Sequence, residues 1–180
     1  MKIYTFPQLA LKKMLETNPI PREKLLRSAF IRISSKELME FPFDNDDEFI
    51  KENVIEFSFC DIEEDDWESN KSELIKAEDR EEKATGIRPR YSPITEEEAK
   101  EIVKFVKKHV EKGTRVLFIH CDAGVCRSNS VAYAIAKYIL KDEEQANLIE
   151  NSPHSLISST ITSKIKKAVE HLENNRKTKV

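Results

Sequence analysis

Two apolar segments separated by a short polar loop constrain the fold of this chain most. The run 115–119 (RVLFI) is compact and apolar, and 129–140 (NSVAYAIAKYIL) is apolar on nearly every side. A short apolar run bounded by polar residues is typical of a buried parallel strand, and a helix that is apolar all round is a buried helix. The sequence therefore predicts a strand, a loop and a central helix in the core of an α/β domain.

Strands and helices are expected to alternate along the rest of the chain. The expected strands cover 2–6, 29–33 and 54–59, and the expected helices cover 8–16, 46–51, 95–113, 143–150 and 153–173. The helix at 95–113 begins with a capping box, TEEE, and its apolar positions are Ala99, Ile102, Val103, Val106 and Val110. The alternation predicts a three-layer sandwich with a central, mostly parallel sheet flanked by helices.

A charged segment around 62–92 is expected to be an insertion in a single domain, 1–180;. It has little apolar periodicity, so its simplest interpretation is a solvated, partly helical surface segment. A lid or specificity loop is the alternative, because the segment leaves a strand end near the proposed site. Trp67, Arg88, Arg90 and Tyr91 would contact substrate in that case, and otherwise would pin the segment to the body.

The loop between the two apolar segments, 120–128 (HCDAGVCRS), is suited to a phosphate dianion. The first N–H groups of the following helix lack partners, and the helix dipole makes that end positive. Gly124 lets the backbone turn so that several N–H groups point inward, and Arg127 adds a fork that holds two oxygens. This chemistry needs no metal or other cofactor. The expected phosphate-binding residues are Asp122, Ala123, Gly124, Val125, Cys126 and Arg127.

Cys121 begins this loop and is the candidate nucleophile. The positive field that attracts phosphate also favours a thiolate over a thiol, and a thiolate beneath a bound phosphate can attack in line to give a phosphocysteine. The Ser128 hydroxyl would stabilise the departing thiolate, and His120 is expected to orient the loop by a hydrogen bond. The alternative is that Cys121 is only a small buried apolar residue.

HCDAGVCRS resembles the H-C-x-x-G-x-x-R-[ST] loop of the cysteine-based protein tyrosine phosphatases, and the short chain looks most like their compact, dual-specificity-like members. The resemblance is specific over 115–140, looser from 54 onward, and slight before that. It implies a phosphoric monoester hydrolase with Cys121 as nucleophile, Arg127 and the loop backbone as phosphate ligands, and Ser128 as the group that assists thiolate release.

The general acid of such a reaction protonates the leaving oxygen and then activates water. In the family it is an aspartate on a loop after an upstream strand, and Asp61 matches that place; Asp65 and Asp66 are the alternatives. The separation of Asp61 from Cys121 is longer than is usual in compact members, and the charged insertion supplies the excess. A simple cap on the next turn is the other interpretation of Asp61.

Cys126 gives the loop a second thiol. The low-molecular-weight branch of the family has the same C-x4-C-R-S spacing, and by that resemblance Cys126 is a redox candidate that forms a disulfide with an oxidised Cys121. A small filler beneath the loop is the alternative, and Cys60 is also placed to reach the site. Three cysteines are too few for a disulfide scaffold;. With no signal-peptide pattern at the start, a reducing, cytoplasmic location is expected.

Charge and composition limit the classes of molecule that the chain is expected to bind. The net charge of -3 argues against a nucleic-acid partner, and no apolar run approaches the ~20 residues that span a bilayer;. Asp122 is acidic where phosphoinositide phosphatases that resemble this family usually carry lysine. We therefore expect a monomer that acts on singly phosphorylated proteins or peptides, first of all phosphotyrosine, with phosphoserine and phosphothreonine left open.

Two other classes of protein compete with this interpretation. A catalytically silent phosphate-binding module would keep the loop but lack a working acid. A redox or metal protein would use His120, Cys121 and Cys126, but their spacing differs from the C-x2-C of common zinc sites, and a metal has no use for Arg127;.

Overall fold

A parallel sheet forms the centre of the computed structural model, which describes residues 1–36 and 39–177. Its strands are β1 (Lys2–Pro7), β2 (Ser28–Ile33), β3 (Val54–Phe57) and β4 (Val116–Cys121). Within the described residues their order is β1-β4-β2-β3, and each neighbouring pair is parallel. The carboxyl ends of the strands therefore meet at one edge of the sheet.

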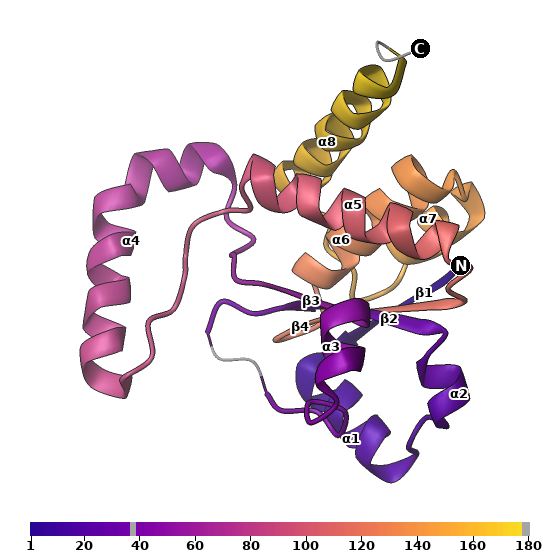
Figure 1. Ribbon diagram of the computed structural model, residues 1–180. Helices are drawn as coiled ribbons and strands as arrows, with labels where there is room; N and C mark the ends of the chain where they lie inside the picture. The colour runs from indigo at the N-terminus through magenta and orange to yellow at the C-terminus, as the bar shows by residue number, and fades with distance from the viewer. Residues whose placement is uncertain (37–38, 178–180) are drawn as a thin grey trace.

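Helices cover both faces of this sheet, which confirms the predicted α/β sandwich (Figure 1). The helices α1 (Gln8–Thr17) and α3 (Asp47–Asn53) lie on one face, and α2 (Arg22–Leu25) leads into β2. The other face carries α5 (Glu96–Glu111), α6 (Arg127–Ala134), the π-helix η1 (Ile135–Leu140), α7 (Glu143–Glu150) and α8 (Ser159–Lys177).

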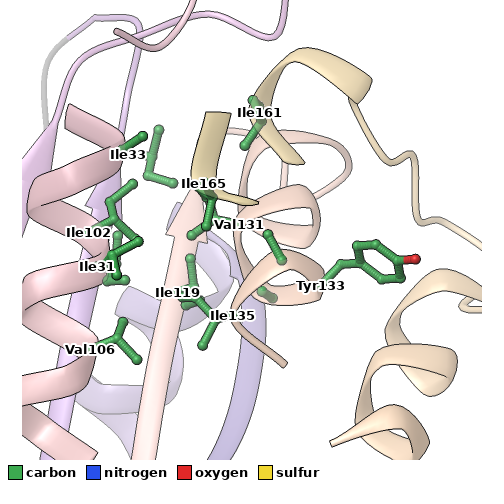
Figure 2. Close-up of a cluster of buried hydrophobic side chains, with 14 of the residues drawn as sticks. Ile31, Ile33, Ile102, Val106, Ile119, Val131, Tyr133, Ile135, Ile161 and Ile165 are labelled. Atoms are coloured by element: carbon green, nitrogen blue, oxygen red, sulfur yellow. The ribbon is translucent and has the colours of Figure 1, made fainter. Parts of the chain in front are cut away.

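The main core lies between the sheet and the helices α5, α6 and α8 (Figure 2). Ile31 and Ile119 project from β2 and β4 toward Ile102, Val131 and Ile165, and all five are buried. A smaller core on the opposite face is largely aromatic, and its buried rings are Phe30, Phe41, Phe43, Phe49 and Phe118. Because both faces are covered, β2 is buried along its whole length, as expected of an inner parallel strand;.

Most predicted elements occur near their predicted places, but several ends differ. The strand expected at 54–59 stops at Phe57, and the strand expected at 115–119 continues through Cys121. Pro7, expected in the first turn of the first helix, ends β1 instead and precedes α1. The last helix begins at Ser159 rather than 153, because Leu156 donates its backbone N–H to Val125 and is held in the extended connection.

The buried stripe of α5 also differs from its predicted composition at one position. Val110 is 44% exposed, whereas His109 is completely buried. The imidazole of His109 has partners on both sides, Thr114 Oγ1 at 2.8 Å and the carbonyl of Glu52 at 3.2 Å. These two hydrogen bonds compensate for burying a polar ring, which the apolar pattern of the helix could not indicate.

The predicted insertion is one long helix, α4 (Glu64–Thr85), which stands beside the body on the side where β3 ends (Figure 1). Glu78 is its only buried residue, so α4 is a largely solvated helix. No helix in the described part of the chain is long and apolar enough to cross a bilayer.

Candidate active site

The predicted phosphate loop lies at the carboxyl edge of the sheet, between an inner strand and a buried helix. Cys121 is the last residue of β4, and Arg127 is the first of α6. The side chain of Cys121 is nearly inaccessible, with 1% of its surface exposed. In open α/β sheets this edge is where ligands bind, so the fold places the loop where its sequence requires.

Two hydrogen-bonding groups converge on the sulfur of Cys121. The backbone N–H of Gly124 donates to Sγ at 3.2 Å, and the Ser128 hydroxyl lies 3.2 Å from the same atom. Ser128 is completely buried, so its hydroxyl is fixed in place. Hydrogen bonds to the charged form of an acid favour that form, and this arrangement therefore suits a thiolate.

The backbone of the loop is tightly packed at Gly124. This residue has φ +70°, and a Cβ added there would lie 2.4 Å from the backbone nitrogen of Pro7. Only glycine tolerates both the left-handed conformation and this approach. Pro7 is thus part of the loop's support, although the sequence alone offered no reason to connect the two segments.

Two polar residues at the start of α6 hold the loop and were missed by sequence reasoning. Asn129 donates to the carbonyls of Gly124 and Val125, at 3.4 and 2.8 Å. The Ser130 hydroxyl donates to the Cys126 carbonyl at 2.8 Å and accepts from the backbone N–H of Ser158. The available signal was two polar residues at the start of a helix that is otherwise apolar.

Arg127 is buried and is held by two acceptors. Its Nη1 donates to the carbonyl of Phe59 at 3.1 Å, and its Nη2 donates to Oδ2 of Asp122 at 2.7 Å. Burial works against the charge of Arg127, but Asp122 outweighs it, and the net pKa of the guanidinium is raised. The guanidinium therefore stays charged beside Cys121.

The carboxylate of Asp122 turns toward the end of β2. Besides Arg127, it accepts hydrogen bonds from the Ser34 hydroxyl at 2.7 Å and from the hydroxyl and backbone N–H of Ser35 at 3.2 and 3.3 Å. Burial alone would raise the pKa of Asp122. The hydrogen bonds from Ser34 and Arg127 lower it by more than burial raises it, so the net pKa is below its ordinary value. The sequence predicted only its place in the loop.

The expected orienting hydrogen bond of His120 is absent. Both ring nitrogens are buried without a hydrogen-bond partner among the described residues, and the ring lies 5.0 Å from that of Phe41. Burial, followed by the charge of Arg32, lowers the pKa of His120 to about 3 against an opposing effect of Asp122. His120 is a neutral packing residue here, and Asn129 and Ser130 orient the loop instead.

Among the three candidate acids, Asp61 is the one whose charge acts on groups of the loop. Burial and then the charge of Asp61 raise the pKa of Cys126 to about 11. The same two causes raise the pKa of Cys60, and Asp61 also helps to raise the pKa of Arg127. The Asp61 carboxylate therefore acts electrostatically on the second cysteine and the arginine of the loop. The alternatives, Asp65 and Asp66, are exposed in the first turn of α4.

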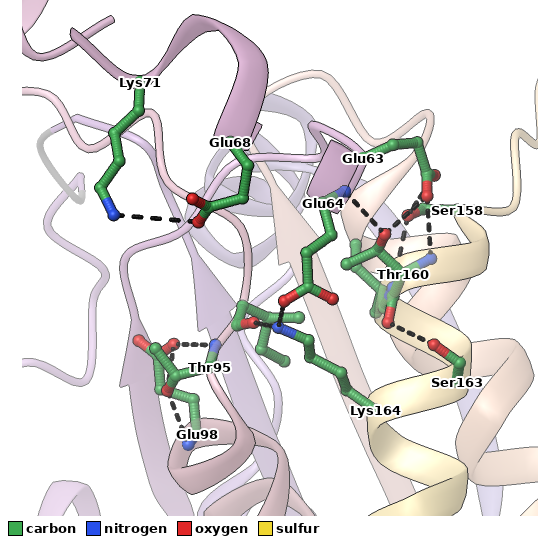
Figure 3. A network of polar contacts seen from close by, with 12 residues as sticks. Glu63, Glu64, Glu68, Lys71, Thr95, Glu98, Ser158, Thr160, Ser163 and Lys164 are labelled. Atoms are coloured by element: carbon green, nitrogen blue, oxygen red, sulfur yellow. Dashed lines mark hydrogen bonds and ion pairs between the residues drawn. The ribbon is translucent and has the colours of Figure 1, made fainter. Parts of the chain in front are cut away.

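The segment that carries Asp61 is fixed on both sides. Before it, the backbone N–H of Cys60 donates to the carbonyl of Ser92 at 2.9 Å. After it, Glu63 accepts hydrogen bonds from Ser158, Ser159 and Thr160, the residues that begin α8 (Figure 3). Asp61 therefore lies between two anchors, although its own side chain is exposed.

Of the other side chains considered for the insertion, Arg90 contacts the body, and the rest contact the insertion itself. Arg88 pairs with Glu78, Asp79 and Glu82 of α4. Arg90 pairs with Glu98 of α5, and the Tyr91 hydroxyl donates to Glu81. Trp67 is half-buried near Lys71, whose ammonium lies 5.9 Å from the centre of the ring. The anchoring interpretation therefore accounts for Arg90, whereas the contacts of Arg88 and Tyr91 lie within the segment itself.

No protein-family model and no curated protein sequence matches the chain. Solved phosphatase structures do resemble its α/β fold. Among them are the Cydia pomonella PTP-2 phosphatase (9% identity, 93% of this chain and 85% of that chain, TM-score 0.51) and PTPMT1 (14% identity, 98% and 95%, TM-score 0.49). Tk-PTP in the active form is 18% identical over 93% of this chain and 90% of its own, with a TM-score of 0.43. At these identities the likeness to PTP-2 phosphatase shows a shared fold.

Proposed function

We propose that this chain is a phosphatase that hydrolyses phosphomonoesters through a phosphocysteine intermediate. The observation that carries the proposal is the environment of Cys121, whose buried sulfur has the Gly124 N–H and the Ser128 hydroxyl each 3.2 Å away. The charged Arg127 begins the helix that follows. A nucleophile, an anion-binding helix end and a fixed cation thus occupy one small volume.

The reaction proceeds in two displacements. The Cys121 thiolate attacks phosphorus, the bond from phosphorus to the ester oxygen breaks, and Asp61 gives that oxygen its proton. Asp61 then takes a proton from water, which attacks the phosphocysteine. The sulfur–phosphorus bond breaks, inorganic phosphate leaves, and Ser128 stabilises the returning thiolate while Arg127 holds the phosphoryl oxygens.

The proposed substrate is a singly phosphorylated protein or peptide, with phosphotyrosine first and phosphoserine or phosphothreonine as further candidates. The support is the anionic Asp122 within the loop, since its lowered pKa keeps it charged and a negative charge there disfavours a second phosphate;. The proposal also includes a monomer and a reducing, cytoplasmic location, and the three free cysteines support a reducing environment;.

Hydrolysis of para-nitrophenyl phosphate tests the phosphatase proposal. The wild type should turn over, Cys121→Ser should not, and Cys60→Ser is the matched control that removes a thiol outside the loop. Turnover that persists in Cys121→Ser would contradict the proposal. A wild type that binds phosphate without turnover would instead be a silent phosphate-binding module.

A pH–rate profile of the wild type, Asp61→Ala, Asp65→Ala and Asp66→Ala assigns the general acid. We expect the basic limb to disappear in Asp61→Ala alone, because Asp61 is the candidate acid whose charge raises the pKa values of Arg127 and Cys126. Disappearance in another variant would move the role there, and four identical profiles would remove all three candidates.

We also propose that Cys126 resolves oxidised Cys121. Peroxide converts the Cys121 thiolate to a sulfenic acid, and the Cys126 sulfur displaces water from it to form a disulfide. Because the pKa of Cys126 is raised to about 11, this step should be slow at neutral pH and faster in alkali;. Disulfide mapping by mass spectrometry after peroxide tests it. Inactivation that thiols cannot reverse, with no Cys121–Cys126 bond, would contradict the proposal.

A further inference from the structure

We propose that Asp122 is a positioning residue, whose carboxylate holds the guanidinium of Arg127 in the orientation that receives a phosphoryl group. The inference rests on the proposed phosphatase function and adds a role for the Asp122 side chain within it. The resemblance to phosphatase loops assigned Asp122 only a place in the loop backbone.

The contact between Asp122 and Arg127 is short and is enclosed on the arginine side. Oδ2 of Asp122 lies 2.7 Å from Nη2 of Arg127, and the Arg127 side chain is only 10% exposed, whereas that of Asp122 is 36% exposed. A charge-assisted hydrogen bond at this distance fixes direction as well as distance. Nη1 of Arg127 donates a second hydrogen bond, to the carbonyl of Phe59. The two acceptors together determine the plane of the guanidinium.

The carboxylate of Asp122 is also held by groups other than Arg127. The Ser34 hydroxyl donates to Oδ1, and the hydroxyl and backbone N–H of Ser35 donate to Oδ2. Ser34 and Ser35 directly follow β2, Phe59 follows β3, and Asp122 follows β4. The brace formed by Asp122 and Arg127 therefore joins the carboxyl ends of three strands, one of which leads to Asp61.

The brace still leaves Arg127 able to bind an anion. A guanidinium has five N–H donors, and the contacts with Asp122 and Phe59 occupy one hydrogen on each of the two Nη atoms;. The N–H of Nε and one N–H on each Nη atom remain available to an anion;. A side chain with its plane already fixed loses less entropy when phosphate binds.

The negative charge of Asp122 also has an opposite effect, because a nearby carboxylate repels a phosphate dianion. Its four donors, including Arg127, spread and offset that charge. The two effects predict opposite results when the carboxylate is removed. Loss of positioning weakens anion binding, whereas loss of repulsion strengthens it.

Tungstate binding to the full chain, measured by calorimetry, separates these effects without requiring turnover. We expect Asp122→Ala to weaken tungstate binding by about tenfold or more, the equivalent of one charge-assisted hydrogen bond. Asp122→Asn keeps an acceptor for Arg127 and a polar group for Ser34, so its affinity should lie between those of wild type and Asp122→Ala. Asp47→Asn, on the exposed first turn of α3, controls for the loss of one carboxylate.

A double-mutant cycle tests whether Asp122 acts through Arg127. In an Arg127→Lys background the planar fork is gone, so Asp122→Ala should no longer weaken tungstate binding. Equal weakening in both backgrounds would overturn the inference, as would unchanged or tighter binding in Asp122→Ala. Equal affinities of Asp122→Asn and Asp122→Ala would overturn it too. Should Asp122→Ala fail to fold, Asp122→Ser, which is too short to reach Arg127, takes its place.

Kinetics distinguish a failure of this inference from a failure of the proposed function. If the wild type binds tungstate but does not hydrolyse para-nitrophenyl phosphate, the phosphatase proposal fails and the positioning role stands on the binding data. If the wild type turns over and Asp122→Ala has the same KM, kcat and tungstate affinity, the positioning role fails and the phosphatase proposal stands. A positioning role predicts a raised KM with an unchanged thermal midpoint for Asp122→Asn.

Discussion

Gly124 combines two constraints that make it the least replaceable backbone position of the loop. Its φ of +70° belongs to the left-handed region, and the space where a Cβ would project is occupied by Pro7 and Phe6. Its N–H also donates to the sulfur of Cys121. One residue thus shapes the phosphate cradle, supports the thiolate and packs the loop against β1.

Gly124→Ala should therefore lower kcat/KM by about a hundredfold, because the loop must move away from Pro7 and misplace the nucleophile. Gly86→Ala is the matched control. Gly86 has a similar φ of +76°, but nothing lies within 4 Å of a Cβ built there. The control should lose about 1 kcal/mol of stability, the strain of the left-handed conformation, and keep wild-type kcat/KM. Equal kinetic effects in both variants would show that the Pro7 contact is unimportant.

The elements around the loop were largely readable from sequence. The strand and helix that flank 120–128 follow from their apolar runs, and the capping box of α5 is present as predicted. What could not be predicted depends on contacts between distant segments. The Pro7 contact with Gly124 and the contact of Asp122 with Ser34 join segments that only the sheet order brings together.

The start of α4 shows the same limit in another form. The sequence indicated a charged, solvated insertion, and the first residues are indeed acidic. Yet Glu63, one acid among several, differs from its neighbours because it accepts four hydrogen bonds from the beginning of α8. Burial raises the pKa of Glu63, but the bonds from Thr160, Ser159 and Ser158 together lower it below its ordinary value.

Glu63→Ala should lower both stability and kcat. The variant loses the acceptor at the start of α8, which is expected to destabilise the fold by about 1 kcal/mol, and it frees the segment that carries Asp61. Urea unfolding and para-nitrophenyl phosphate kinetics measure the two effects. Glu68→Ala, which removes an exposed carboxylate 3.8 Å from Lys71, is the control and should change neither;. A normal kcat in Glu63→Ala would show that the hydrogen bonds between Glu63 and the start of α8 do not position Asp61.

Across the whole molecule, two buried histidines link stability to pH. His109 lies on the buried face of α5, and His120 lies in β4, next to the loop. Burial lowers the pKa of both, that of His120 to about 3. An unfolded chain protonates histidine near pH ~6.5, so below that pH the unfolded state binds more protons. The free energy of unfolding therefore falls as the pH falls from 6.5 toward the folded pKa values.

Urea unfolding between pH 6.5 and 5.5 tests this linkage, because the carboxylates whose pKa is lowered by folding change the stability mainly below about pH 5;. The wild type should lose stability by up to about 1.4 kcal/mol per pH unit for each buried histidine. His120→Leu, which keeps an apolar contact with Phe41, should lose less. His154→Leu controls for the added apolar surface at an exposed site. Equal slopes for His120→Leu and wild type would contradict the buried neutral state of His120.

The central claim of this account is that the phosphoryl group passes through the sulfur of Cys121. Acid quenching during turnover of an aryl phosphate, followed by peptide mass spectrometry, detects that intermediate directly. Asp61→Ala should be included, because without the residue that activates water the intermediate should accumulate. The account predicts one phosphoryl group on the peptide that contains Cys121, and none in Cys121→Ser. Sustained turnover with no phosphoryl group on Cys121, or with the group on another residue, would contradict it.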